Sequence, residues 1–338
     1  MFEQKEDYMI KANGFSYQKC EYVYIKEFKD NKWQEGYLST EDTINISVMS
    51  TSLHYGQQAF EGLKAYKVSD GSINLFRVKE NAKRFIKSCS RMMMPVIFED
   101  EFTKIIVELV KANKKYIPEN NKSEALYIRP LMIGVGPKLG VGPSNDYMLI
   151  VTVTPVGAYF NNLAKTRCLT TFYDRAAPNG TGMVKVGPNY GSSLYALSSV
   201  KALGYNDAVF LDPLTHTKIE EVGAANFFGI TYDNKYITPK SNSILPSITN
   251  DSLKVIARDY LSLEVIEEDV YINDLKRFKE ASACGTGALI TPISSITHLG
   301  EETVFLTHDK SLELKEILTN IHYSVIPDKY DWITKIVL

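Results

Sequence analysis

The sequence has 338 residues, 44% of them hydrophobic, and this length is usual for two domains that each bury a core. Its 38 basic and 40 acidic residues leave a net charge of −2, which gives no basis for binding nucleic acid or anionic lipid. The four cysteines lack the spacing of a disulfide framework or a zinc site, so we expect no metal. The charged N-terminus lacks an apolar export segment, and no apolar run reaches the ~18 residues of a membrane span. We therefore expect a cytoplasmic protein without a membrane anchor.

Alternating apolar residues and turn signals predict a mixture of strands and helices in the first half of the chain. We predict strands at 22–25, 63–68, 73–76 and 148–155, and helices at 82–93 and 102–110. The turn at 29–32 indicates a hairpin with the segment after Trp33. Asp70-Gly71, between two predicted strands, is the dipeptide typical of a tight hairpin.

The second half alternates short strands with helices. We predict strands at 208–211 and 227–231, and helices at 192–203 and 250–260. A polar segment over 161–173 reads as an interdomain linker. The pattern fits a mixed α+β protein with a smaller N-terminal domain over 1–160 and a larger, strand-rich C-terminal domain over 174–338.

One lysine lies in an apolar, glycine-rich turn. Lys185 follows Gly182-Met183-Val184, and Tyr190 lies five residues later, at the start of a predicted helix. Desolvation lowers the pKa of a lysine, and the neutral amine is the nucleophile that forms a Schiff base with an aldehyde or ketone. The alternative is a lysine whose amine extends out of the turn into solvent.

Two further segments predict an anion site. The run 243–251 reads as a strand that Pro246 interrupts before a helix, which Ser247 or Thr249 can cap. Free amides at such a helix start suit a phosphate group, and the run 283–288 exposes more amides near the hydroxyl of Thr286.

A pair of carboxylates, Glu220 and Glu221, comes directly before an apolar strand. A lysine, a carboxylate, a tyrosine and a phosphate cradle together suggest pyridoxal 5'-phosphate (PLP) as the cofactor. The lysine would take the aldehyde, the carboxylate the ring nitrogen, the tyrosine the phenolic oxygen and the amides the phosphate.

From about Tyr22 to Trp332 the chain resembles the branched-chain amino acid aminotransferases of PLP fold type IV. Seven motifs carry the resemblance in order: Leu53-His54-Tyr55-Gly56 with Phe60-Glu61-Gly62, Tyr127-Ile128-Arg129-Pro130, Pro155-Val156-Gly157-Ala158-Tyr159-Phe160, the Lys185 segment, Glu221-Val222-Gly223, Ile244-Leu245-Pro246 and Cys284-Gly285-Thr286. The resemblance implies two domains with PLP at their interface, and Lys185 as the catalytic Schiff-base lysine.

The resemblance also assigns cofactor contacts. It implies that the phosphate is held by Arg84, Ile248, Thr249 and Thr286. It selects Glu221 for the ring nitrogen, leaving Glu220 solvated or structural, and it places Tyr190 at the phenolic oxygen. From the residues alone, Arg84 lies off the apolar stripe of its helix and could equally be a solvent-exposed arginine. Tyr190 could equally be a core residue whose hydroxyl reaches solvent.

For the substrate, the resemblance implies an aromatic pocket with polar groups at its ends. Its members are Phe60, Tyr127, Arg129, Tyr159, Thr286 and Gly287, with Tyr55, Leu139 and Val141 reaching in from a second subunit. Tyr127 and Arg129 lie two apart on a predicted strand, so their side chains share a face. Two apolar side chains at the tip of the 139–142 loop favour a homodimer, because a partner would cover them.

The implied activity is reversible transfer of the amino group of leucine, isoleucine or valine to 2-oxoglutarate. Alternatives within the fold are a D-amino-acid or amine transaminase, or an aminodeoxychorismate-type lyase. A PLP-binding protein without catalytic activity is a further alternative. The chain departs from many relatives at Gly287, where alanine is common, at Ala224, where some carry threonine, and at Ala288 and Thr291, where the animal enzymes have a CxxC pair.

Overall fold

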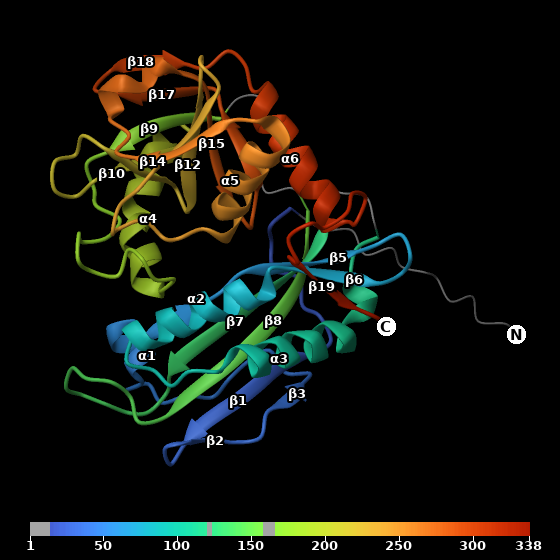
Figure 1. The fold of residues 1–338 in the computed structure, drawn as a ribbon. Coiled ribbons are helices and arrows are strands. Elements are labelled where there is room, and N and C mark those ends of the chain that lie inside the picture. The colour runs from blue at the N-terminus through green and yellow to red at the C-terminus, as the bar shows by residue number, and fades with distance from the viewer. Residues whose placement is uncertain (1–13, 120–123, 158–165) are drawn as a thin grey trace, which may run out of the picture.

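A computed structural model describes residues 14–119, 124–157 and 166–338. These residues form two lobes, each built on one β-sheet with helices packed against it (Figure 1). Strands and helices are mixed in both lobes, so the predicted α+β class is confirmed. Within the described residues, no helix is long and apolar enough to cross a lipid bilayer.

The first lobe holds a sheet with the strand order β19-β6-β5-β7-β8-β1-β2, with β3 beside β1 and β4 beside β7. Its strands are β1 (Val23–Lys29), β2 (Lys32–Trp33), β3 (Tyr37–Ser39), β4 (Gln58–Phe60), β5 (Leu63–Lys67), β6 (Ile73–Phe76), β7 (Ala125–Gly134), β8 (Tyr147–Val156) and β19 (Ile333–Ile336). Its helices are α1 (Thr51–Tyr55), α2 (Val78–Arg91) and α3 (Glu99–Ala112), with a 3-10 turn, η1 (Lys114–Tyr116).

Both predicted hairpins and both predicted helices of this lobe are present. Asp30 and Asn31 have positive φ angles of 53° and 58°, as a two-residue turn between twisted antiparallel strands requires. The apolar stripes of α2 and α3 join one core with the sheet, where the rings of Phe85 and Phe102 lie 5.6 Å apart.

The second lobe holds a sheet with the order β14-β13-β12-β11-β10-β9-β17-β18, with β15 between β12 and β16. Its strands are β9 (Arg167–Thr171), β10 (Asp207–Leu211), β11 (Ile219–Val222), β12 (Ala225–Thr231), β13 (Lys235–Pro239), β14 (Glu264–Glu268), β15 (Phe278–Gly285), β16 (Leu289–Ile293), β17 (Ser295–His298) and β18 (Glu301–Val304). Its helices are α4 (Gly187–Ala202), α5 (Ile248–Leu261) and α6 (Asp309–His322), with a 3-10 segment, η3 (Ile272–Arg277). Helices α5 and α6 share one core and α4 lies in another.

Three expectations about the course of the chain need correction. The helix predicted at 192–203 begins at Gly187, because Pro188 suits a first turn, where its missing N–H is not needed. The predicted linker 161–173 contains β9, which pairs with β10 and β17 and therefore belongs to the second sheet. The end of the chain returns to the first lobe as β19, which pairs with β6, so residues 174–338 are not confined to one lobe.

Candidate active site

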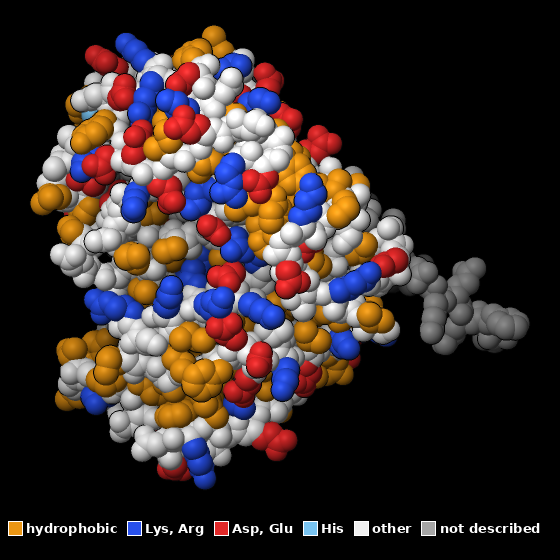
Figure 2. Space-filling model, viewed as in Figure 1, with side chains coloured by type: hydrophobic (Ala, Val, Ile, Leu, Met, Phe, Trp, Pro, Cys, Tyr) orange, Lys and Arg blue, Asp and Glu red, His pale blue; other side chains and the backbone are white. Residues whose placement is uncertain are grey.

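A cavity of about 580 Å³ lies between the two lobes. Figure 2 shows Lys and Arg side chains gathered along the hollow that separates the lobes on this face. Most of the predicted site residues line the cavity: Phe60, Arg84, Tyr127, Arg129, Lys185, Tyr190, Glu221, Thr286 and Gly287. The first four come from the first lobe and the others from the loop before α4, from α4, from β11 and from the turn after β15.

The first lobe holds the backbone of Lys185 in place from two sides. Its carbonyl accepts a hydrogen bond from the N–H of Phe60 (3.0 Å), and its N–H donates to Ser88 Oγ (2.9 Å). The side-chain amine, Nζ, donates to the hydroxyl of Tyr190 at 2.7 Å. The ring of Tyr190 meets the ring of Phe60 edge to face, with centroids 4.8 Å apart.

The Lys185 amine is desolvated, as the sequence predicts. Burial, followed by the nearby charge of Arg84, lowers its pKa from 10.5 to about 8. Met183 is 47% exposed, but Val186 is fully buried and Val184 packs against the same core. The side chains that line the cavity enclose the amine as well, and the alternative of an amine extended into solvent does not hold.

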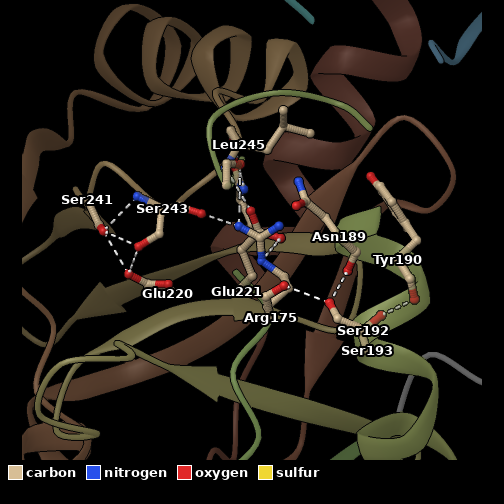
Figure 3. A network of polar contacts seen from close by, with 12 residues as sticks. Arg175, Asn189, Tyr190, Ser192, Ser193, Glu220, Glu221, Ser241, Ser243 and Leu245 are labelled. Carbon is tan, nitrogen blue, oxygen red and sulfur yellow. Dashed lines mark hydrogen bonds and ion pairs between the residues drawn. The ribbon is translucent and has the colours of Figure 1, made fainter. Parts of the chain in front are cut away.

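The two adjacent carboxylates of β11 are both buried (Figure 3). Glu221 lines the cavity, where its Oε1 accepts the N–H of Leu245 at 2.9 Å and its Oε2 lies 3.2 Å from Arg175 Nε. Burial raises the pKa of Glu221. Glu220 accepts hydrogen bonds from Ser241 Oγ (2.7 Å) and Ser243 Oγ, so it is structural rather than solvated.

Arg84 is buried against a carboxylate. Its Nε and Nη2 donate to the two oxygens of Glu61 at 2.6 and 2.9 Å, and its Nη1 donates to the carbonyl of Pro246 at 3.0 Å. Burial opposes ionisation of Glu61, but Arg84, together with Lys185 and Asn81, outweighs burial and lowers the pKa of that carboxyl group. The side chain of Arg84 is only 11% exposed, which rules out a solvated arginine.

The start of α5 lies beside the cavity. Its N-cap is Ser247, whose side chain accepts the N–H of Asn250 at 3.1 Å. Ser247 lines the main cavity, whereas Ile248 and Thr249 do not. Ile248 and Thr249 instead line a small void of about 20 Å³, which shares Thr286 with the main cavity.

The strand β7 presents Tyr127 and Arg129 on one face toward the cavity, as predicted. Arg129 Nη2 donates to the hydroxyl of Tyr127 at 3.0 Å, and its guanidinium carbon lies 4.8 Å from the ring centroid of Phe60. No carboxylate among the described residues pairs with Arg129. Tyr159, also predicted for this pocket, lies outside the described residues.

The residues predicted to reach in from a second subunit do not line the cavity of their own chain. Leu139 and Val141 are 82% and 89% exposed at a loop tip. The hydroxyl of Tyr55 donates to the carbonyl of Leu139, and Val141 follows two residues later in the same exposed loop.

Three buried residues of this region were not assigned a role from the sequence. Arg175 pairs with Glu221, Glu61 pairs with Arg84, and Lys64 donates from β5 to the carbonyl of Gly287 at 2.8 Å. Glu61 belongs to a recognised motif and could have been found there. Arg175 and Lys64 carry no local signal, because only the folded chain brings them to their partners.

The chemistry of these side chains fits PLP. The groups that line the cavity include the Lys185 amine of lowered pKa, the Tyr190 phenol, the buried carboxylate of Glu221 and the guanidinium of Arg84 beside a helix start. These groups match an aldehyde, a phenolic oxygen, a ring nitrogen and a phosphate respectively.

Comparison with known protein families agrees with this arrangement. Residues 58–296 match the family described as amino-transferase class IV. The chain therefore belongs to the class-IV aminotransferases, and it is a PLP-dependent transaminase.

Individual relatives of the chain narrow this family to one group of aminotransferases. The chain is 50% identical over 333 residues to a branched-chain-amino-acid aminotransferase of Haemophilus influenzae (96% of this chain, 97% of the relative), and 47% identical to one of Helicobacter pylori (96% of each). A solved branched-chain aminotransferase from the archaeon Thermoproteus uzoniensis, with norvaline, superposes with a TM-score of 0.78 at 26% identity, covering 94% of this chain and 99% of that one. A solved branched-chain amino acid aminotransferase with pyridoxamine 5'-phosphate superposes with a TM-score of 0.79 at 28% identity. The chain lies within the branched-chain amino acid aminotransferases of fold type IV, as its motifs predict.

Proposed function

We propose that this enzyme moves the amino group of leucine, isoleucine or valine to 2-oxoglutarate, and back, in one cavity used by both substrates in turn. The observation that carries this proposal is the layout of the cavity. The Lys185 amine and the Arg129 guanidinium each lie 4.8 Å from the centroid of the Phe60 ring, and Arg129 donates a hydrogen bond to the hydroxyl of Tyr127.

The cofactor contacts follow from the positions of the donors. Tyr190 would hydrogen-bond the phenolic oxygen, Glu221 would hold a proton at the ring nitrogen, and Arg84 would bind the phosphate. The amides of Ile248 and Thr249 and the Thr286 side of the turn after β15 complete the phosphate contacts. Bound PLP supplies an aldehyde that condenses with amines and a cationic ring that withdraws electrons from the substrate's α-carbon.

Lys185 has two tasks in this proposal. Its Nζ would bind the aldehyde carbon of the cofactor, and the same Nζ would move the proton that leaves the substrate's α-carbon. A pKa of about 8 suits both tasks, since an appreciable fraction of the amine is neutral near pH 7. Tyr190, 2.7 Å away, orients the amine.

The two substrates differ in one charged group. Phe60, Tyr127 and Tyr159 would supply apolar walls for a branched side chain. Arg129, which no carboxylate of the described residues neutralises, would meet the distal carboxylate of glutamate directly or through the Tyr127 hydroxyl. The α-carboxylate common to both substrates would bind at the amides of Thr286 and Gly287.

We further propose a cytoplasmic homodimer. The support is the exposed group of Tyr55, Leu139 and Val141, whose apolar surface a second subunit would cover while completing the substrate pocket. Sedimentation of the protein and of a Leu139→Asp variant tests the dimer, and a monomeric wild type would refute it.

A spectrum of the purified protein, recorded with and without leucine, tests the activity. The visible band of bound cofactor should disappear with leucine and return with 2-oxoglutarate. Arg129→Met should then lower kcat/KM for glutamate or 2-oxoglutarate by roughly 10²-fold or more and that for leucine far less, since a lost charged contact costs more than a retained apolar wall. Equal losses for both substrates would leave Arg129 as a structural residue.

A further inference from the structure

Arg175 occupies the centre of the polar network behind the cavity (Figure 3). It lies four residues after the end of β9 and is 7% exposed. Its Nη2 donates to the carbonyls of Ser243 and Gly182, the latter at 3.5 Å. Its own carbonyl accepts a hydrogen bond from Ser192 Oγ in α4 at 2.8 Å. The side chain of Arg175 thus joins the loop before Lys185 to the loop before α5, and its backbone carbonyl adds a contact to the first turns of α4.

The charge of Arg175 faces one carboxylate. Its Nε lies 3.2 Å from Oε2 of Glu221, although this N–H is not aligned for a hydrogen bond. The contact is therefore an ion pair in which charge matters more than direction. The other oxygen of Glu221 accepts the N–H of Leu245, so the carboxylate is held from two sides.

Without this cation the buried carboxylate of Glu221 would keep only the Leu245 N–H and the charge of Lys185 as compensation, against burial and the charge of Glu220. Burial raises the pKa of Glu221, and among the influences that lower it the charge of Arg175 is the largest. Removing one partner of a buried ion pair leaves the other charge uncompensated, which favours its neutral form. A neutral Glu221 could no longer stabilise a proton on a ring nitrogen beside it.

Glu220, the neighbouring carboxylate of β11, stabilises the loop that contacts Arg175. Glu220 accepts hydrogen bonds from Ser241 Oγ and Ser243 Oγ, and the carbonyl of Ser243 in turn accepts from Arg175. The loops approach so closely that a Cβ at Gly182 would lie 2.2 Å from the Ser243 carbonyl oxygen. The position of Arg175 is therefore fixed by contacts that do not involve Glu221.

We propose that Arg175 is a positioning residue that keeps Glu221 ionised and aimed at the ring nitrogen of the cofactor. Glu220 supports this role through the loop that carries Ser243. The inference rests on the proposed function, because that function assigns Glu221 to the ring nitrogen.

A double-mutant cycle of Arg175→Met and Glu221→Gln tests this role. Two quantities are measured on each protein loaded with PLP: the pH titration of the visible cofactor band without substrate, and the single-turnover rate with leucine. Arg175→Met should lower the rate by roughly 10–100-fold, the usual range when a residue that supports a direct contact is lost. In the Glu221→Gln background the same change should cost less than about 3-fold, and Arg175→Lys should fall between wild type and Arg175→Met because it keeps the charge.

The spectrum separates this role from a merely structural one. Arg175→Met should gain a pH-dependent transition of the cofactor band that the double variant lacks, since the titrating group is Glu221. Arg277→Met is the matched control, because Arg277 is half-buried, pairs with Glu268 at 2.8 Å and lies outside the cavity. It should behave as wild type.

The outcomes are distinct. Equal rate losses in both backgrounds, or a cofactor band that titrates alike in all variants, would overturn the role of Arg175. If Arg175→Met does not fold, the cycle is run with Arg175→Lys, and additive losses there would overturn the role equally. A wild type that neither binds PLP nor reacts with leucine would overturn the proposed function as well, whereas an active wild type with an additive cycle would overturn only this inference.

Discussion

The lowered pKa of Lys185 leads to a quantitative prediction about how fast the protein captures an aldehyde. Only the neutral amine reacts, and a pKa of about 8 in place of 10.5 makes roughly one amine in ten neutral at pH 7. At a pKa of 10.5 that fraction would be roughly one in 3,000. Burial in the cavity, with the charge of Arg84, should therefore make Lys185 about 300-fold more available than an exposed lysine at this pH.

The assay follows the absorbance of pyridoxal mixed rapidly with cofactor-free protein between pH 6 and 10. Pyridoxal has no phosphate group, so the predicted phosphate contacts of Arg84 do not enter the rate. The fast phase should rise about tenfold per pH unit below about 8 and level off above it. Lys185→Ala should lack this phase and keep only the slow reaction of surface lysines. A rate that keeps rising up to pH 10 would refute the desolvation of Lys185.

Three further predictions concern the surroundings of the site. Arg84→Ala should raise the Kd for PLP more than it lowers kcat at saturating PLP, because a phosphate contact contributes mainly uniform binding. The substitution leaves Glu61 buried without its ion-pair partner, so the double variant Arg84→Ala, Glu61→Gln is the control for stability. An unchanged Kd for PLP would exclude phosphate binding by Arg84. Peroxide should not inactivate the enzyme reversibly, because all four cysteines are buried and burial raises the pKa of the Cys284 thiol; activity regained with a reductant would contradict this. Burial, with the charge of Lys64, lowers the pKa of His322 to about 3, so between about pH 6.5 and 3 the unfolded chain binds a proton that the folded chain does not. The free energy of unfolding should therefore fall by up to about 5 kcal/mol as the pH drops through this range. Urea unfolding of His322→Phe should show a smaller loss, and parallel pH profiles of the two proteins would contradict the prediction.

Local elements of the fold were predictable because their signals are local. Turn dipeptides and apolar periodicity placed the hairpins and the helices α2 and α3. The strand β9 and the return of β19 to the first sheet were missed, since such pairing joins residues far apart in the sequence. Ile333, for example, pairs with Phe76. The first turn of α4 was missed because Gly187, Pro188 and Gly191 are weak helix formers, so this turn carries no helical sequence signal.

The sequence by itself determined the chemistry available to this protein. The lysine, tyrosine, adjacent carboxylates and expected phosphate cradle predicted a PLP site, and the family resemblance added Arg84 and selected Glu221; Lys185, Tyr190, Glu221 and Arg84 all line one cavity. Residue type suffices for the first part, because the amine, phenol and carboxylate are properties of the residues themselves.

Only the tertiary structure decided how these groups are charged and held. Glu61 beside Arg84 and Arg175 beside Glu221 are ion pairs between residues 23 or more positions apart, and the amine of Lys185 loses its water to walls from both lobes. Burial and charge pairing depend on distances in space and on the exclusion of solvent. Neither quantity exists until the two sheets have closed around the cavity.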